Sequence, residues 1–224
     1  MIFVLTGAGL SAESGLGTFR DEGGLWTQYD LSEVATPEGF AADPEKVLAF
    51  YNARRANADS ATPNAAHTAL ARLSQQTQTA LVTQNVDSLL EAAGARDVIH
   101  MHGQLDWALC AGCGARWDAP AVMQVSDPCP ACAAKATRPD VVWFGEMPYH
   151  MDRIENALSA ADLFVAIGTS GTVYPAAGFV EMARAYGIET LELNLEPSGG
   201  RFDDGLYGPA TDIVPDWVDR VLTA

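Results

Sequence analysis

The chain has 224 residues, of which 48% are hydrophobic and 19% are charged. These proportions fit a globular protein with a sizeable core, and they exclude a disordered tail, a fibrous repeat and a coiled coil. Asp and Glu number 29 against 13 Lys and Arg, giving a net charge of −16, so neither nucleic acid nor an anionic membrane is an expected partner. The longest apolar runs are too short to cross a bilayer.

Short apolar runs alternate with helical patterns along the chain. Strands are predicted at Ile2–Thr6, Thr79–Thr83, Asp97–His100, Leu163–Gly168 and Thr190–Leu195. Helices are predicted at Pro44–Ala58, Pro63–Leu73, Val86–Ala93, Met151–Ala161, Ala176–Tyr186 and Pro215–Leu222, with Pro63 and Pro215 in first turns. The alternation predicts an α/β fold with a Rossmann-like, doubly wound parallel sheet covered on both faces.

A glycine-rich turn follows the first predicted strand. Gly7-Ala8-Gly9-Leu10-Ser11-Ala12 matches G-x-G-x-x-G/A, in which glycines let backbone N–H groups approach a pyrophosphate. An ordinary strand-to-helix turn is the alternative, because this pattern alone is weak evidence for a dinucleotide. Three more glycines between positions 17 and 24 indicate a loop over a pocket rather than a packed helix.

Tyr51 and Arg54 lie three residues apart on a predicted helix, so they share one face. A guanidinium can bind a carboxylate through two hydrogen bonds, and a phenol can add another. The pair could therefore recognise an acidic group, which this acidic protein would otherwise repel. A solvated helix face is the alternative.

Polar residues follow the next two predicted strands. Asn85 and Asp87 are two residues apart and could face one pocket, although Asp87 could instead cap a helix starting near Ser88. His100 and His102 would have both rings on one face of an extended segment. An ordinary pKa near 6.5 suits His102 to removing a proton at neutral pH. A packing or surface histidine is the alternative, and it is the role expected for His67 and His150.

The chain contains four cysteines, Cys110, Cys113, Cys129 and Cys132, spaced as C-x2-C, 15 residues, C-x2-C. This spacing predicts one structural tetrathiolate zinc site, which leaves no open position for water. Two disulfides are the alternative. The N-terminal residues show no secretion signal, so a reducing compartment, most simply the cytoplasm, is expected.

The predicted elements suggest a single catalytic domain with two lobes. The large Rossmann lobe is expected at about 1–22, 65–103 and 140–224. The small lobe is expected to combine helices at about 23–64 with a zinc ribbon at about 104–139.

A set of motifs in fixed order resembles the sirtuin family, the NAD-dependent protein lysine deacylases. The motifs are Gly7 to Arg20, Thr83-Gln84-Asn85-Val86-Asp87, His100-Met101-His102-Gly103, the four cysteines, Val141-Val142-Trp143-Phe144-Gly145-Glu146, Gly168-Thr169-Ser170 and Asn194-Leu195-Glu196. Segments 37–40 and 50–55 are similar to the bacterial, CobB-type branch. The resemblance spans essentially the whole chain.

The resemblance implies a reaction between NAD and an acyl-lysine peptide in the cleft between the lobes. It implies that the acyl oxygen attacks the sugar carbon as nicotinamide leaves, and that a base then lets a ribose hydroxyl attack the resulting imidate. Water finally releases free lysine and 2′-O-acyl-ADP-ribose. The Tyr-x-x-Arg pair resembles that of class III sirtuins and implies removal of succinyl and malonyl groups, with acetyl also accepted. The other readings are a mono-ADP-ribosyltransferase or NAD hydrolase, a nicotinamide dehydrogenase, and a zinc-ribbon interaction module. The partners expected are acyl-lysine proteins, and the protein is expected to be a monomer.

The resemblance also assigns roles to residues. It implies His102 and Asn85 as the catalytic residues, with His102 as the base, and Asp87 as the acceptor of a hydrogen bond from the carboxamide of nicotinamide. It implies NAD contacts from Gly7, Ala8, Gly9, Ser11, Glu13, Ser14, Gly15, Thr18, Phe19, Arg20, Trp26, Gln84, Asn85, Val86, Asp87, Gly168, Thr169, Ser170, Asn194, Leu195, Glu196 and Ala210. It implies substrate contacts from Tyr51, Arg54, Val142, Trp143, Phe144 and Gly145, the last four by pairing as a strand with the peptide backbone.

Overall fold

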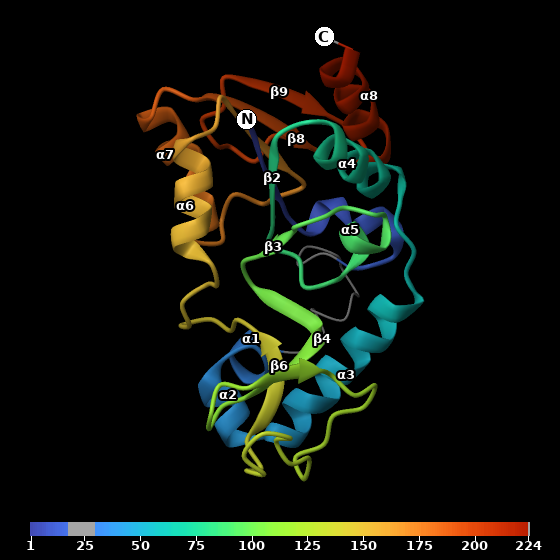
Figure 1. Ribbon diagram of the computed structural model, residues 1–224, viewed down its shortest axis with the longest axis vertical. Coiled ribbons are helices and arrows are strands. Elements are labelled where there is room, and N and C mark those ends of the chain that lie inside the picture. The colour runs from blue at the N-terminus through green and yellow to red at the C-terminus, as the bar shows by residue number, and fades with distance from the viewer. Residues whose placement is uncertain (18–29, 224) are drawn as a thin grey trace.

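A six-stranded sheet forms the larger part of the computed structural model, which describes residues 1–17 and 30–223 (Figure 1). Its strand order is β3-β2-β1-β7-β8-β9, and every pair is parallel. The strands are β1 (Ile2–Thr6), β2 (Thr79–Thr83), β3 (Ile99–His100), β7 (Leu163–Ile167), β8 (Glu189–Asn194) and β9 (Asp204–Tyr207). The order reverses between β1 and β7, which is the switch point of a doubly wound sheet, and the predicted fold class is confirmed.

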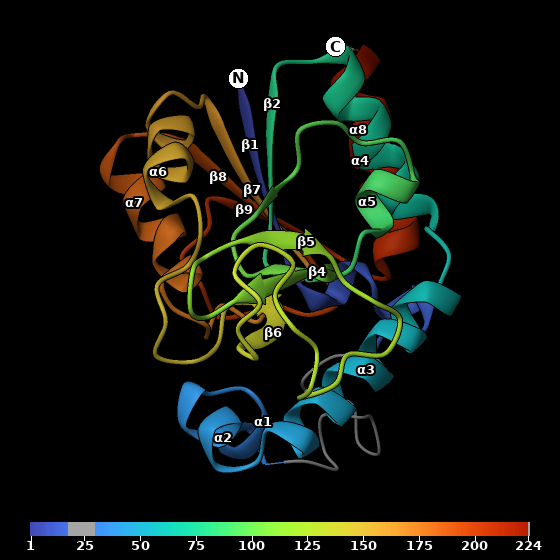
Figure 2. The same ribbon diagram turned by 60° about the horizontal axis from the view of Figure 1, so that its bottom comes forward.

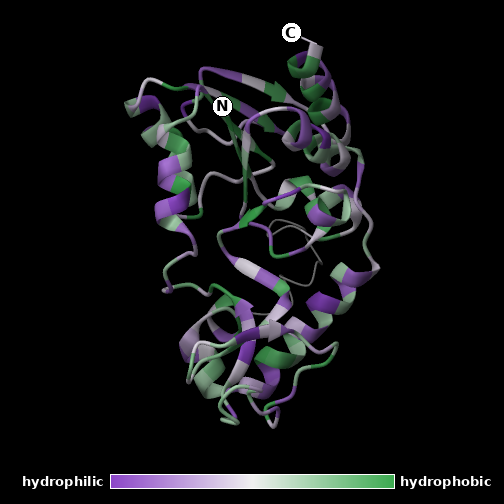
Figure 3. Ribbon diagram, in the orientation of Figure 1, coloured by the Kyte–Doolittle hydropathy of each residue, from purple (hydrophilic) through white to green (hydrophobic). Residues whose placement is uncertain are grey.

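Helices cover both faces of this sheet, because alternate residues of each buried strand point to opposite faces. Val4 of β1 packs in a cluster with α4, α5 and α8, whereas Phe3 and Leu5 pack in a second cluster with α6 and α7. In α6, Ile154 and Leu158 are buried, whereas Glu155 and Asn156 between them are polar, which gives this helix its mixed colours (Figure 3). The helices are α4 (Ala65–Gln76), α5 (Leu89–Ala92), α6 (Met151–Ser159), α7 (Phe179–Ala185) and α8 (Ala210–Thr223), with short 3-10 turns at Ala8–Leu10, Ala12–Ser14 and Ala176–Gly178.

A small antiparallel sheet and three helices lie below the carboxyl ends of the large sheet (Figure 2). The sheet has the order β5-β4-β6, with β4 (Gly103–Cys110), β5 (Arg116–Asp118) and β6 (Thr137–Val141). The helices are α1 (Leu31–Val34), α2 (Pro37–Ala42) and α3 (Pro44–Ser60). Val47, Phe50 and Tyr51 of α3 share a buried cluster with Leu105, Val141 and Trp143, so α3 is fixed against the small sheet.

Several predicted boundaries are wrong. Pro63 precedes α4, whose N-cap is Asn64, and Pro215 lies inside α8, which begins five residues earlier at Ala210. The carboxylate of Glu13 caps α8 by accepting the Thr211 N–H at 3.0 Å, a distant contact that no local pattern reveals. The strand predicted at Asp97–His100 is reduced to two residues, and β9 was not predicted.

Among the described residues, each helix is too short or too polar to cross a membrane.

Candidate active site

A cavity of about 1010 Å³ opens at the carboxyl ends of β1, β2, β7 and β8 and extends to α3 and to residues 141–146. Ligands of doubly wound sheets bind at this edge. A second cavity, of about 550 Å³, lies between α3 and residues 123–126, away from the predicted site residues.

Most of the predicted site residues line the large cavity. These are Gly7, Ala8, Gly9, Ser11, Glu13, Gly15, Tyr51, Arg54, Gln84, Asn85, Val86, Asp87, His102, Val142, Trp143, Phe144, Gly145, Gly168, Thr169, Ser170, Asn194, Leu195 and Ala210. Ser14 and Glu196 are not among the lining residues. Thr18, Phe19, Arg20 and Trp26 fall outside the described residues.

The glycine-rich turn is packed against the turn that follows β7. The Gly9 N–H donates to the Gly168 carbonyl at 2.8 Å, and a Cβ on Gly9 would lie 2.7 Å from the Cα of Gly168. Gly168 itself has φ +60°, a conformation that favours glycine. The glycines are therefore required by the close approach of two protein turns, in addition to any approach of a ligand.

His102 lines the cavity, and one of its ring nitrogens contacts the protein backbone. Its Nδ1 lies 3.1 Å from the Gln84 carbonyl, which can only accept, so Nδ1 carries the proton. Burial lowers the pKa of His102. The ring is therefore neutral at pH 7, with its unprotonated Nε2 able to accept a proton.

His100 does not share this pocket, contrary to the prediction that both rings lie on one face. It is 6% exposed and does not line the cavity. Its Nδ1 lies 3.2 Å from the Asn85 carbonyl and its Nε2 lies 2.7 Å from the Glu91 carboxylate. The alternation fails because β3 ends at His100 and the next residues form a turn.

Asn85 and Asp87 are joined by a network centred on Ser11. The Ser11 hydroxyl donates to Asp87 Oδ2 at 3.0 Å and accepts from Asn85 Nδ2 at 3.1 Å. His67 Nε2 lies 3.3 Å from the same hydroxyl, and its Nδ1 accepts the Asn64 N–H at 3.2 Å. Burial raises the pKa of Asp87, although hydrogen bonds from the Leu89 N–H and from the Ser11 hydroxyl oppose the rise. His67 was expected to have only a structural role, and its contact with Ser11 in the site was not predicted.

Asp87 also accepts a hydrogen bond at the start of α5, in line with the helix-capping alternative predicted for it. Its Oδ1 accepts the Leu89 N–H at 3.2 Å, while Oδ2 is held by Ser11. Each oxygen of the Asp87 carboxylate thus accepts a hydrogen bond from the protein.

The part of the cavity lined by α3 carries an aromatic and a cationic side chain. Tyr51 is 1% exposed and accepts a hydrogen bond from Trp143 Nε1 at 2.9 Å. The Arg54 guanidinium lies 5.5 Å from the centre of the Tyr51 ring. Burial lowers the pKa of Arg54, with Tyr51 and Asp87 opposing the shift, but a guanidinium stays charged. Among the described lining residues, Arg54 is the one Lys or Arg.

Residues 142–145 form the cavity wall between the two sheets. Val142 N donates to the His102 carbonyl and Phe144 N donates to the Ala35 carbonyl, each at 2.9 Å. Trp143 N donates to Glu146 Oε2 at 2.8 Å. These three N–H groups therefore have partners within the chain, which narrows the predicted strand-like pairing to the remaining backbone groups.

Arg138 and Glu146 hold this segment, and sequence reasoning gave neither residue a role. Arg138 donates to both Glu146 oxygens at 2.6 and 2.9 Å and to the Val141 carbonyl at 2.7 Å. Glu146 is the last residue of the Val141–Glu146 motif and Arg138 lies three residues before Val141, and no pattern of short spacing signals their pairing.

Polar groups also line the end of the cavity beside β7 and β8. Asn194 Nδ2 donates to the Thr169 carbonyl at 2.9 Å, and the Ser170 and Thr172 hydroxyls lie 2.8 Å apart. Ser14 Oγ is buried without a partner among the described residues. Ser14 does not line the cavity, but the backbone turns and hydroxyl side chains that do line this end fit a polar, phosphate-bearing ligand such as a dinucleotide.

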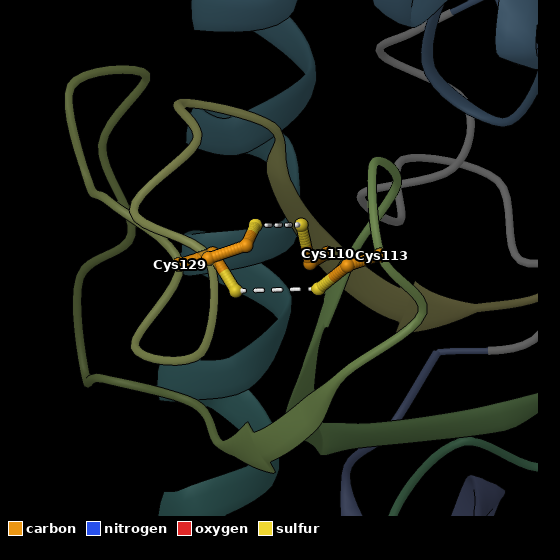
Figure 4. A group of neighbouring side chains, drawn as sticks. Cys110, Cys113 and Cys129 are labelled. Atoms are coloured by element: carbon orange, nitrogen blue, oxygen red, sulfur yellow. Dashed lines mark hydrogen bonds between the residues drawn. The ribbon is translucent and has the colours of Figure 1, made fainter.

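The four cysteine sulfurs lie within 4.8 Å of one another. Cys110 and Cys132 Sγ are 3.7 Å apart, as are Cys113 and Cys129 Sγ, and the labelled cysteines point together in Figure 4. A disulfide requires about 2.05 Å, whereas a tetrahedron with Zn–S bonds of about 2.3 Å has edges of about 3.8 Å. The donor set therefore fits one structural zinc ion.

Comparisons with known proteins agree with this geometry. Residues 7–175 match the model of the Sir2 family. The chain is 60% identical to an NAD-dependent protein deacylase of Caulobacter vibrioides, over 99% of this chain and 96% of that protein.

Solved structures are similar over the whole fold. The crystal structure of a Sir2 homologue–NAD complex superposes with a TM-score of 0.91 at 38% identity, covering 99% of this chain and 89% of that one. A Sir2 protein with a deacetylated p53 peptide and 3′-O-acetyl-ADP-ribose gives a TM-score of 0.81 at 27% identity, covering 100% and 92%.

Proposed function

The chain belongs to the Sir2 family and is an NAD-dependent protein deacylase, and we propose that it removes succinyl and malonyl groups, as well as acetyl groups, from lysine side chains. The observation that carries this proposal is the Tyr51–Arg54 pair in the cavity wall. A guanidinium and a phenol together suit the carboxylate at the end of such an acyl chain.

The negative charge of the protein and of the cavity lining also supports this role for Arg54. The protein carries a net charge of −16, and Glu13, Asp87 and Glu146 also line the cavity. A free carboxylate entering such a site is repelled unless a cation meets it. Arg54 is that cation within the described lining, and its partial desolvation strengthens its attraction for an anion.

NAD is the co-substrate, and bound NAD supplies an electrophilic sugar carbon with nicotinamide as the leaving group. We propose that the turns at residues 7–15 and 168–170 hold its phosphates and that Asn194 and Ala210 contact its adenosine. Asn85 and Asp87, fixed through Ser11, would orient the nicotinamide end.

His102 acts as the base in this proposal. Its neutral Nε2 would take a proton from a ribose hydroxyl, while the Gln84 carbonyl holds the ring through Nδ1. The acyl oxygen would bond to the sugar carbon that nicotinamide leaves, and the deprotonated hydroxyl would attack the acyl carbon. A water molecule would then complete the release of the lysine amine and 2′-O-acyl-ADP-ribose.

Replacing Arg54 with Met tests the acyl preference. The Arg54→Met variant is expected to lose at least about tenfold in kcat/KM for a succinyl-lysine peptide, because a charge-assisted contact of about 1.5–3 kcal/mol is removed. Its kcat/KM for the acetyl form of the same peptide should change much less. Arg72→Met is the matched control and should alter neither, because Arg72 forms a half-exposed ion pair and does not line the cavity. Equal losses on both peptides would refute the acyl preference.

A further inference from the structure

We propose that the indole N–H of Trp143 sets acyl specificity by fixing the Tyr51 hydroxyl with its hydrogen directed into the cavity. This inference rests on the proposed function, because it explains how Tyr51 would recognise an acidic acyl chain. Trp143 acts through Tyr51 and is a positioning residue in this role.

The donor chemistry of the contact decides the direction of the phenol hydrogen. Trp143 Nε1 lies 2.9 Å from the Tyr51 oxygen. An indole N–H can only donate, so the phenol oxygen must accept. The Arg54 guanidinium, whose carbon lies 5.5 Å from the centre of the Tyr51 ring, can likewise only donate. With the indole N–H on its oxygen, the phenol has its own hydrogen left to donate.

Burial makes that hydrogen significant. Tyr51 and Trp143 are 1% and 2% exposed, yet both line the cavity. Burial raises the pKa of Tyr51, so the phenol keeps its hydrogen at neutral pH. A buried donor is satisfied only by an acceptor, and a carboxylate is a stronger acceptor than a neutral group. A succinyl chain brings a carboxylate to this end of the cavity, whereas an acetyl group ends in a methyl.

The indole is itself held firmly. Its ring packs 5.2 Å from Phe40, centre to centre, and the Arg138 guanidinium carbon lies 3.4 Å from its ring centre. Its backbone N–H is bound by Glu146, which also binds Arg138. The indole N–H is therefore a preorganised donor whose position does not depend on the substrate.

A double-mutant cycle tests the inference. The measured quantity is the ratio of kcat/KM for succinyl and acetyl forms of one peptide in wild type, Trp143→Phe, Tyr51→Phe and the double variant. Trp143→Phe keeps an aromatic ring but removes the N–H, and it should lower the ratio about fivefold, the effect of one hydrogen bond. The drop should appear as a higher KM for the succinyl peptide, with the KM for NAD unchanged. Tyr51→Phe should lower the ratio at least as much, and adding Trp143→Phe to it should lower it no further.

Trp107→Phe is the matched control, since Trp107 is 38% exposed on β4 and does not line the cavity. It should leave the ratio unchanged. Equal loss on both peptides in Trp143→Phe, or an additive loss in the double variant, would overturn the inference. If Arg54→Met lowers the ratio but Trp143→Phe does not, the inference fails alone. A wild-type enzyme without desuccinylase activity would overturn the proposed function and the inference together.

Discussion

His102 combines a fixed tautomer with a lowered pKa, and both follow from where its ring lies. The Gln84 carbonyl holds Nδ1–H, and burial disfavours the imidazolium. A base of this kind works in its neutral form, so its activity is lost as pH falls through the lowered pKa.

The pH profile of kcat/KM should therefore rise from acid to neutral pH with a midpoint below 6.5 and remain level above it. Asp87, whose pKa is raised by burial, can also contribute to the rise of kcat/KM between acid and neutral pH. The pH profile of Asp87→Asn separates its contribution from that of His102. His102→Ala should abolish turnover while the protein still binds NAD. A midpoint above 6.5, or turnover in His102→Ala, would contradict His102 as the base.

His67 gives a prediction about stability. It is fully buried, and burial lowers its pKa from 6.5 to about 4. The unfolded chain binds the proton more readily, so the contribution of neutral His67 is present above pH 6.5 and is lost as pH falls toward 4. The full loss is about 3 kcal/mol.

The free energy of unfolding from urea titrations between pH 7 and 5 should thus fall less steeply with pH in His67→Gln than in the wild type. His150→Gln is the control, because His150 is exposed. Parallel slopes for His67→Gln and wild type would argue against a neutral buried His67.

At the scale of elements, the sequence predicts best where an element is buried and continuous. β1 and β2 were predicted to the residue because a parallel strand covered on both faces is an unbroken apolar run. β9 was not predicted, because Asp204–Tyr207 lies at the edge of the sheet and has no such apolar run. The same distinction holds for the site, where local motifs were predictable and long-range contacts were not. The local motifs located the cavity, but the contact of His67 with Ser11 spans 56 residues and depends on packing.

The small sheet should depend on its zinc. Four thiolates join the turn after β4 to the turn before β6, so metal binding contributes to the folding free energy of this part. Chelation should abolish amide-exchange protection at residues 103–141 while leaving that of residues 163–194 largely intact, and added zinc should restore it.

Activity should fall with that protection, because β6 carries Arg138, which holds the cavity wall through Glu146. Reduced protein without bound zinc in metal analysis, or unchanged protection after chelation, would contradict a structural zinc site.

At the scale of the molecule, one cavity brings together the turns of the large sheet, the base, and a wall carried by α3 and residues 142–145. The sequence predicted the glycine-rich turns and His102 on one side of this cavity, and Tyr51, Arg54 and residues 142–145 on the other. It could not predict their spacing, because that depends on how α3 packs against the small sheet through Tyr51, Trp143 and Val141.

Mass spectrometry of a complete reaction tests the account most directly. A succinyl-lysine peptide incubated with NAD should give unmodified peptide, nicotinamide and succinyl-ADP-ribose in equal amounts. An ADP-ribosylated peptide, or free ADP-ribose with the succinyl group still on lysine, would contradict acyl transfer as the reaction of this site.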